Sequence, residues 1–585
     1  MVEKRYTSLE YRLPLEYFPI FYGVSRPRVY RVFESFSRNE ILSLVALLSK
    51  EYQYKPIRNV LRLLNDDNWW KRFLKYRIEK YLAGRETAQK AYVVCFPQTL
   101  LEIMRISFSM KPSTNSMYAN NTYRLEFNLI KAIAWINERM MGFSVNNRSN
   151  LQQLLITGLG FNKEIQQYQP QDQFRIVLNL SVSFFEFISS NEKYASLYNS
   201  FLDKYKIRNW TEYVYTLLFL SMQARSGAGF LDLTKDIDPD HLLSKSVLDA
   251  ISIDLNTVIP YASEDEYDNG GNSDYKVFRD KPIIKISDNE YFIFHTGFVL
   301  DRLYFSLYFD FKNLTSGNSQ VSKLFTTEFI EKTIFDKLIQ QSVSEKRYNS
   351  YSEEQCAAQY KPAQGELGCP DFLLQSTTTT NVILFECKDI KINAWVKEQR
   401  NYSLLEQELQ NKLMLKTWTL DSKSRTHKQK RPRKIGVGQL AGHCANIRRG
   451  SFKWGTSIRP QATVYPVLFV ADNRLVIDGL PNLLADWYQQ SLISENVVSD
   501  NKNRPLVIMS PLCLLKHCDR FRRDGFEKYF EEYYQHIQDR TGEDVDLINA
   551  NVTFDEYMDT YRYNLADRFE ELKNKLLEQR DHASN

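Results

Sequence analysis

The segment that most constrains the fold is a pair of apolar runs separated by a polar turn, in residues 371–388. The first run occupies residues 371–375 (DFLLQ), the turn 376–381 (STTTTN), and the second run 382–388 (VILFECK). Short apolar runs on either side of Ser, Thr and Asn residues predict an antiparallel β-hairpin. Pro370 is compatible with this hairpin, because a proline at the start of a strand need not donate a ladder hydrogen bond.

The chemically active residues of the hairpin lie near its open end. Side chains alternate between the two faces of a strand, so Glu386 and Lys388 share one face while Cys387 points into the core. With the turn centred in the polar segment, Asp371 lies across from residues 386–388, within cross-strand reach. Carboxylates provide the hard oxygen ligands that Mg²⁺ and Mn²⁺ prefer, and a lysine beside them suits an anionic substrate. The hairpin therefore predicts a divalent-metal site with a cationic neighbour.

A third acidic residue, Glu331, lies in a predicted amphipathic helix at residues 324–343 (LFTTEFIEKTIFDKLIQQSV). Five positions of the apolar stripe fall within about 60° of Glu331 at 100° per residue: Leu324, Thr327, Ile334, Phe335 and Leu338. Glu331 therefore points inward, where a carboxylate needs a cation, a hydrogen-bond donor or water. The alternatives are a buried salt bridge and a bend in the helix that brings Glu331 to solvent.

Length and composition bound the architecture and the compartment. A chain of 585 residues predicts about two to four domains. It has no run of about 18 apolar residues, which argues against a membrane span, and its N-terminus lacks the apolar core of a secretory signal. Its seven cysteines show neither zinc-ligand nor disulfide-framework spacing. We therefore expect a cytoplasmic protein that does not enter a membrane.

The positive charge is concentrated in one zone, residues 422–471, which contains 11 Lys or Arg residues and no Asp or Glu. The whole chain has a net charge of only +5, so the remainder is net acidic. A basic zone of this kind is typical of nucleic-acid binding, although a solvated basic loop without a ligand is the alternative. The candidate nucleic-acid-binding residues are Lys423, Arg425, Lys428, Lys430, Arg431, Arg433, Lys434, Arg448 and Arg449.

A second segment, residues 69–77 (WWKRFLKYR), alternates basic and aromatic residues. Such a segment can bind nucleic acid through stacking and charge. We favour the other interpretation, a helix with a buried aromatic face and solvated lysines.

The predicted architecture is a multidomain α + α/β protein. Residues 1–262 form a mainly helical accessory domain, and residues 263–275, which are acidic and contain Gly270 and Gly271, form a linker. Residues 276–480 form an α/β core with a central mixed sheet, which includes a hairpin at 282–294, a basic loop at 423–434, a helix at 438–447 and a last core strand at 464–470. Residues 481–585 form a helical C-terminal extension.

Pro370-Asp371 followed by Glu386-Cys387-Lys388 resembles the PD-(D/E)xK nuclease superfamily, which has the restriction-endonuclease-like fold. The resemblance extends to Glu331, in a helix before the hairpin, and to Gln439, in a helix after it. It covers about residues 323–471, a quarter of the chain.

The resemblance implies an activity and a role for each residue. Asp371 and Glu386 would be metal ligands as well as catalytic residues, Lys388 the catalytic lysine, Glu331 an auxiliary ligand, and Gln439 a residue that positions water or substrate. The implied function is hydrolysis of phosphodiester bonds, with DNA as the substrate and Mg²⁺ or Mn²⁺ as cofactor. A bacterial antiphage or restriction effector, recruited or activated by a protein partner and able to oligomerise, is the implied setting.

Two other functions remain open. One is a catalytically silent nucleic-acid-binding scaffold that keeps a nuclease fold, and the other is a toxin or effector that cleaves RNA. Retention of Asp371, Glu386 and Lys388 argues against the first, because an inactive relative is free to lose them.

Overall fold

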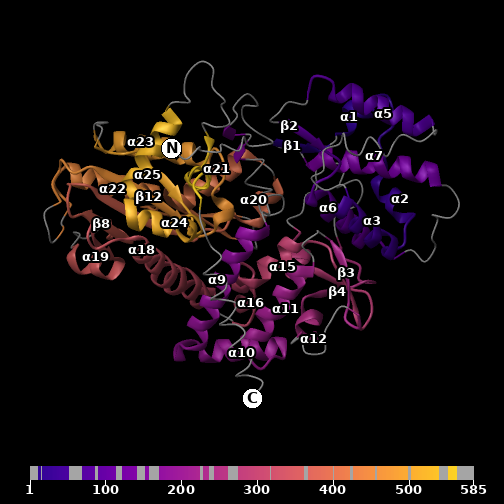
Figure 1. Cartoon of the computed structure of the whole chain (residues 1–585), viewed down its shortest axis with the longest axis horizontal. Coiled ribbons are helices and arrows are strands. Elements are labelled where there is room, and N and C mark those ends of the chain that lie inside the picture. Colours follow the sequence, from indigo (N-terminus) through magenta and orange to yellow (C-terminus); the bar gives the residue numbers. More distant parts are fainter. Residues whose placement is uncertain are drawn as a thin grey trace. The chain divides into compact units, whose positions relative to one another are not determined.

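The computed structural model (Figure 1) describes the following residues: 11–14, 16–51, 69–85, 90–112, 122–140, 152–153, 155–156, 170–223, 228–235, 243–260, 275–315, 318–360, 367–399, 401–421, 426–452, 454, 458–497, 502–538 and 551–562.

The chain divides into two compact units. The sheet unit comprises Met1–Tyr6, Phe143–Lys163 and Gly317–Leu572, and the helical unit comprises Thr7–Gly142, Glu164–Ser316 and Lys573–Asn585. This division differs from the predicted boundaries. Residues 276–315 belong to the helical unit, residues 481–572 belong to the sheet unit, and the predicted linker at 263–275 falls outside the described residues except for Tyr275.

Helices make up most of the helical unit. Its elements are β1 (Tyr11–Pro14), α1 (Tyr17–Ile20), α2 (Val29–Glu34), α3 (Arg38–Glu51), α5 (Trp69–Leu82), β2 (Lys90–Val93), α6 (Pro97–Ser109), α7 (Thr122–Met140), α9 (Pro170–Ser189), η2 (Glu192–Tyr194), α10 (Ala195–Tyr205), α11 (Trp210–Gln223), β3 (Gly229–Asp232), α12 (Lys245–Ala250), β4 (Ser252–Asp254), α14 (Lys276–Asp280), β5 (Ile283–Lys285), β6 (Glu290–Ile293), α15 (Thr296–Leu303) and α16 (Leu307–Asn313). The predicted hairpin at 282–294 is present as β5 and β6, but it completes the four-stranded sheet β3-β6-β5-β4 of this unit.

A five-stranded mixed sheet organises the sheet unit, in the order β13-β12-β9-β8-β7. Its strands are β7 (Tyr348–Ser352), β8 (Phe372–Ser376), β9 (Val382–Lys388), β12 (Val464–Val470) and β13 (Val507–Met509). The central strand β9 pairs antiparallel with β8 and parallel with β12, so the predicted mixed sheet is present. The prediction that β12 is the last core strand is wrong, because β13 pairs with it in parallel.

One face of the sheet packs against α21 (Tyr402–Leu413), α22 (Val437–Arg448) and α23 (Leu480–Ser494). Leu384 of β9 and Leu468 of β12 are fully buried there, in one apolar cluster with the following helix residues: Leu405, Leu440 and Leu484. The predicted helix at 438–447 is α22, and its buried small residues allow it to lie close to the strands.

The other face packs against η4 (Lys323–Phe335) and α25 (Phe526–Gln538), while α18 (Asp336–Ser342) packs against η4 and α24 (Pro511–Asp524). The ring centroid of Phe385 in β9 lies 6.1 Å from that of Phe335 in η4 and 5.8 Å from that of Phe526 in α25. The predicted helix at 324–343 is thus two elements, the π-helix η4 and the α-helix α18. The short helix α17 (Asn318–Ser322) precedes η4.

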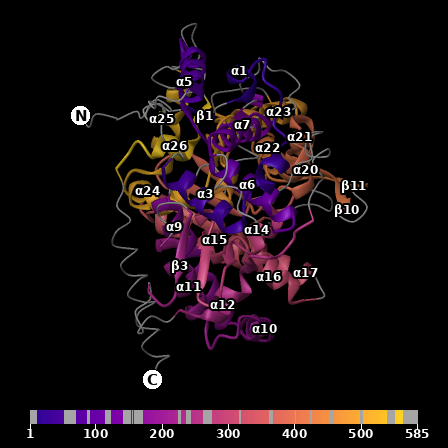
Figure 2. The same cartoon turned by 90° about the vertical axis from the view of Figure 1, so that its right-hand side faces the viewer.

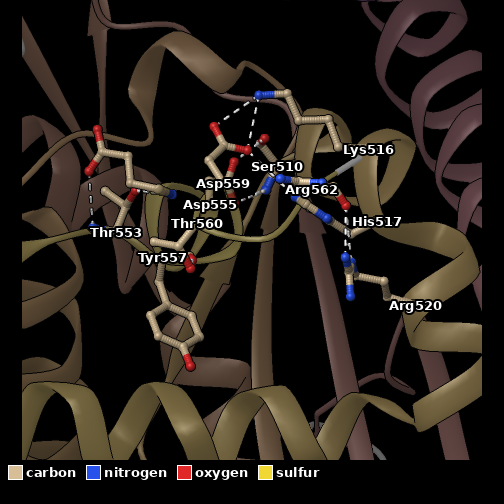
Figure 3. Close-up of polar contacts among 11 residues, drawn as sticks. Ser510, Lys516, His517, Arg520, Thr553, Asp555, Tyr557, Asp559, Thr560 and Arg562 are labelled. Carbon is tan, nitrogen blue, oxygen red and sulfur yellow. Dashed lines mark hydrogen bonds and ion pairs between the residues drawn. The ribbon is translucent and has the colours of Figure 1, made fainter. Parts of the chain in front are cut away.

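Hydrogen bonds attach the short helix α26 (Phe554–Met558) to α24 (Figure 3). The backbone nitrogen and hydroxyl of Ser510 donate to Asp555, and Lys516 Nζ lies 3.0 and 2.9 Å from the two carboxylate oxygens of Asp559. Arg520 donates to the carbonyl oxygen of Arg562 at 2.8 Å. The segment after residue 480 is therefore part of the sheet unit rather than a separate helical extension.

The basic segment that was predicted to be a loop is a β-strand over most of its length. After α20 (Ala394–Gln399) and α21, β10 (Leu415–Asp421) pairs antiparallel with β11 (Thr426–Lys434), with a register shift between Lys416 and Trp418. These two strands form a sheet of their own (Figure 2). Helix α19 (Glu353–Gln359) and η5 (Asn473–Leu475) complete the sheet unit. No helix among the residues that the structure describes is long and apolar enough to cross a membrane.

Candidate active site

The hairpin of β8 and β9 forms at the two apolar runs and the polar turn from which it was predicted. Ser376 closes the turn, because its Oγ accepts hydrogen bonds from the backbone nitrogens of Thr378 (3.3 Å) and Thr379 (3.1 Å). Phe372 pairs with Phe385, and continuing this register by one step puts Asp371 opposite Glu386. The sequence predicted that Asp371 lies across from residues 386–388, so this prediction is confirmed.

Asp371, Glu386 and Lys388 meet at the open end of the hairpin. Lys388 Nζ lies 2.7 Å from Glu386 Oε1 and 3.6 Å from Asp371 Oδ2. Asp371 Oδ2 also accepts a hydrogen bond of 2.7 Å from the backbone nitrogen of Cys387. Lys388 Nζ donates in addition to the Cys387 carbonyl oxygen at 2.9 Å. The three residues predicted from the motif are therefore in direct contact through the ammonium group.

Glu386 carries the least compensated charge of this group. Its side chain is fully buried, and Oε2 has no hydrogen-bond partner among the described residues. Burial and the nearby Asp371 raise the pKa of Glu386 to about 8, although Lys388 opposes the shift. One carboxylate oxygen is therefore buried without a donor, and this is the environment in which a bound cation is favourable.

Lys388 is held in its charged form. Burial alone would lower its pKa, but Glu386 and Asp371 outweigh the burial and hold the pKa of Lys388 well above its usual value. Lys388 therefore acts as a positive charge and hydrogen-bond donor, and it does not act as a proton acceptor in this state.

Glu331 faces a pocket of about 110 Å³ that also reaches Asp371. Burial and Asp371 raise the pKa of Glu331 to about 7, while Lys388 partly offsets them. The pocket is lined by five carboxylates, one lysine and one aromatic ring: Glu331, Asp336, Glu353, Glu354, Asp371, Lys332 and Phe335. Glu331 was predicted to point inward, and it is half-buried beside Asp371 in this pocket.

Asp336 and Glu353 belong to this pocket, and the sequence reasoning missed both. Burial, Glu353 and Asp371 raise the pKa of Asp336 to about 7. Burial and Asp371 also raise the pKa of Glu353. The pocket therefore holds more negative charge than the motif alone predicts.

The π-helical winding explains why Asp336 was missed. Residues five apart are about 140° apart on an α-helix, so an α-helical winding would put Glu331 and Asp336 on different faces. In a helix with i→i+5 hydrogen bonds, they are one turn apart and share a face. The sequence does carry a local signal for Glu353, because Ser352 and Gln355 form a capping box that starts α19. Ser352 pairs with Phe372 across β7 and β8, which brings the start of α19 beside Asp371.

Gln439 and His443, both buried in α22, have structural roles. Gln439 is buried in the first turn of α22, where its Oε1 accepts a 3.0 Å hydrogen bond from the nitrogen of Gly436. No hydrogen bond joins Gln439 to Asp371, Glu386 or Lys388 in the part of the chain that the structure describes. His443 is fully buried against the rings of Tyr360 and Phe452.

Cysteine chemistry has no support at this site. Cys369 is half-buried, and burial together with Glu353 raises its pKa to about 11, so the thiol stays protonated. All seven cysteines are free.

The predicted nucleic-acid-binding residues fall into three groups. Lys423 and Arg425 lie outside the described residues. Lys428, Lys430, Arg431 and Arg433 lie on β11, and Arg433 is exposed.

The third group consists of basic residues that already have partners. Lys434 and Arg449 both form salt bridges with Glu495. Arg448 donates to Asn503 Oδ1 at 2.9 Å and to the carbonyl oxygens of Pro460 and Ala462 at 2.6 Å. Arg448 thus connects α22 to the segments that precede β12 and β13, while Glu495, at the end of α23, joins Lys434 and Arg449, so the three residues stabilise the fold.

The donor set at the open end of the hairpin suits a hard divalent cation. Among the described residues, no three His, Cys, Asp or Glu side chains already lie at metal-binding separation. The Lys388 ammonium lies against the carboxylates of Asp371 and Glu386 instead. The unpartnered Glu386 Oε2 and the raised pKa values of Glu331 and Glu386 nevertheless fit a cation with oxygen ligands.

Comparisons of the chain with protein-family models, with curated proteins and with solved structures find no match.

Proposed function

We propose that the protein is a Mg²⁺- or Mn²⁺-dependent nuclease with a restriction-endonuclease-like core, and that DNA is its substrate. One observation carries the proposal: the oxygen-only carboxylates of Asp371 and Glu386 meet Lys388 at the open end of a buried hairpin. Glu331 approaches the same group from η4. Phosphodiester hydrolysis needs this combination, because the substrate is anionic and the leaving oxygen is poor.

Each residue has a distinct role in this proposal. Glu331, Asp371 and Glu386 hold the cation. When bound there, Mg²⁺ or Mn²⁺ supplies charge neutralisation of the phosphate and a water molecule of lowered pKa. Lys388, charged and fixed by two carboxylates, donates hydrogen bonds toward the negative charge that develops on the phosphate oxygens. Asp371 is kept in place by its hydrogen bond from the Cys387 backbone.

The roles of Gln439 and of the pocket carboxylates follow from their contacts. Gln439 fixes the start of α22 and acts on the site only through that helix. Asp336 and Glu353 add negative charge beside Glu331, which increases the attraction for a cation.

The test is cleavage of supercoiled plasmid, single-stranded DNA and RNA in Mg²⁺ or Mn²⁺. Wild type is compared with Asp371→Asn, Lys388→Met and a matched control, Glu345→Gln. Glu345 is an exposed carboxylate of the same unit that does not line the pocket. We expect wild type and Glu345→Gln to cleave DNA, and both site variants to lose at least a hundredfold in rate. Asp371→Asn lacks a charged ligand of the cation, and Lys388→Met lacks the ammonium group that faces the phosphate.

The other outcomes assign the other functions. Cleavage confined to RNA, with the same dependence on Asp371 and Lys388, would identify a ribonuclease. Binding of nucleic acid without cleavage in either metal would favour the catalytically silent scaffold. Activity that survives both substitutions would show that the site does not carry it.

A further inference from the structure

Helix α5 of the helical unit leaves two large aromatic rings in solvent. Trp69 is 73% exposed and Tyr76 is 61% exposed, although both belong to a helix whose other side is fully packed. The buried residues of α5 are Leu74, Ile78, Tyr81 and Leu82. The sequence interpretation, an aromatic face turned into the core, is therefore wrong for Trp69 and Tyr76.

The exposed residues form one face of α5. Trp69, Arg72, Tyr76 and Lys80 are all exposed, and at 100° per residue they fall within an arc of roughly 80°. The two rings are separated by about 10 Å along the helix axis, roughly three times the 3.4 Å rise between stacked bases. We call these four residues the aromatic–basic face.

The surroundings of this face are strongly positive. Residues 69–85 contain six basic residues and one acidic residue, Glu79. The helix is also rigidly attached: Tyr81 donates a 2.6 Å hydrogen bond to Glu16, and its ring packs edge-on against Tyr92 at 5.3 Å. Aromatic rings on a fixed positive surface are the arrangement that binds unpaired bases and their phosphates.

We propose that the aromatic–basic face binds single-stranded nucleic acid, with Trp69 and Tyr76 stacking on bases and the neighbouring cations contacting phosphates. Stacking is available to single strands but not to a closed duplex, so the face distinguishes the two. The proposal concerns the helical unit and does not depend on catalysis by the sheet unit.

A membrane surface is the competing ligand for a basic, aromatic helix. A helix that lies on a membrane inserts its apolar face and keeps a separate basic face in water. In α5 the apolar face is already buried in the protein core, and the exposed face mixes rings with charges. This arrangement favours single strands over lipid.

The experiment uses the full chain with Asp371→Asn, so that cleavage does not consume the probe. Fluorescence anisotropy measures binding of labelled oligo-dT, oligo-U and a DNA duplex of equal length. The variants are Trp69→Ala, Tyr76→Ala and the ring-preserving Trp69→Phe and Tyr76→Phe. Phe230→Ala is the matched control. Phe230 is another exposed aromatic residue of the helical unit, with 54% exposure, but it lies on β3 rather than α5.

Each alanine variant should weaken single-strand binding by roughly tenfold, because the variant has one base–aromatic stack fewer. Duplex binding should stay within about twofold, and the phenylalanine variants and Phe230→Ala should bind like the parent. Lys80→Gln should lower the slope of log K against log salt by about 0.7 on single strands. Preference for oligo-U over oligo-dT, or the reverse, would identify the natural strand.

Photocrosslinking gives a second readout that does not depend on affinity. Oligonucleotides with 5-iodouracil should crosslink to the peptide that contains Trp69 and Tyr76. The proposal is overturned if the alanine variants bind single strands like the parent, if they lose duplex binding equally, or if crosslinks occur only elsewhere. It is also overturned if the variants lose binding to phosphatidylserine vesicles but not to oligonucleotides.

Discussion

Lys388 Nζ lies 2.7 Å from Glu386 Oε1, and the carboxylate is fully buried while its second oxygen has no partner among the described residues. Removal of one partner from a buried pair leaves an uncompensated charge, which costs about 3–5 kcal/mol. We therefore expect Lys388→Met to lower the melting temperature at pH 8.5, where Glu386 must either bury its charge alone or take up a proton from an alkaline solution.

The same argument fixes the direction of the pH dependence. Because the pKa of Glu386 is raised in the folded state, the folded protein binds a proton at Glu386 more tightly than the unfolded chain does. The stability that this proton contributes is present at low pH and is lost as pH rises through the folded pKa. Lys388→Met should thus lose less at pH 5.5 than at pH 8.5. The double variant Glu386→Gln/Lys388→Met should recover most of the loss. Equal losses at both pH values, or no recovery in the double variant, would contradict this account.

Asp336→Asn should stabilise the protein. The pKa of Asp336 is raised to about 7 in the folded state, so its contribution to stability is present at low pH and is lost as pH rises from about 4 to 7. A shift of this size corresponds to roughly 4 kcal/mol as an upper limit. Thermal unfolding at pH 8 should therefore show a higher melting temperature for Asp336→Asn, with no gain for Glu345→Gln. Mg²⁺ or Mn²⁺ should raise the melting temperature of wild type more than that of Asp336→Asn. An unchanged or lower melting temperature would mean that Asp336 already has a stabilising partner.

Local pattern was sufficient to predict the centre of the sheet unit. The apolar run of β9 is buried along its length up to Cys387, and its polar turn is closed by Ser376, so strand and turn agree with their local sequence. The strand β12 and the helix α22 followed from the same kind of signal. Glu331 was placed correctly in direction, because the residues around it are apolar enough to be buried in either helical winding.

The parts that were missed depend on pairing between distant segments. The strand β13 has only three residues, and it is a strand because Val507, Ile508 and Met509 bond to β12. The strand β11 is highly basic and has little intrinsic preference for a sheet, but β10 supplies its ladder. The spacing of apolar residues within β13 or β11 does not reveal the strand with which each of them pairs.

Burial of the aromatic residues in α5 was wrong for a related reason. Periodicity identifies two sides of a helix, but it does not say which side has a neighbour. Leu74 and Ile78 are buried in the helical unit, whereas Trp69 and Tyr76 are exposed. The residues that line the pocket also depend on pairing between distant segments. Glu353 lies near Asp371 because β7 pairs with β8.

His443 should make the fold sensitive to acid. Burial lowers the pKa of His443 to about 4, and neither ring nitrogen has a hydrogen-bond partner among the described residues. The unfolded chain binds a proton at about pH 6.5 while the folded chain does not, so stability falls as pH drops from about 6.5 to 4, by roughly 3 kcal/mol.

The measurement compares melting temperatures at pH 7.5 and 4.5. His443→Leu should show a smaller fall between the two pH values than wild type, whatever its stability at pH 7.5. His536→Leu, a change at a half-buried histidine of α25, is the control and should fall as wild type does. Parallel curves for wild type and His443→Leu would show that other groups determine the acid sensitivity.

The β10–β11 hairpin should contribute to duplex binding through β11. Among the described residues its two strands pair only with each other, so they form a two-stranded ribbon, an element that fits the major groove of DNA. Lys428, Lys430, Arg431 and Arg433 lie on β11, which has no acidic residue. Neutralising all four to Gln, in the Asp371→Asn background, should weaken duplex binding and lower the salt slope by about 0.9 for each phosphate that the variant leaves without a cation.

The matched control for β11 is Lys434→Gln/Arg449→Gln. Both residues already share the carboxylate of Glu495, so their charges are partly compensated within the protein, and their removal should change the salt slope less than the four-residue variant does. Binding is measured by anisotropy on a DNA duplex at several salt concentrations. If the four-residue variant keeps the parental affinity and slope, β11 does not contact DNA. If the Lys434/Arg449 variant shows the larger loss, the salt bridges to Glu495 open on binding and the duplex lies across α22 instead.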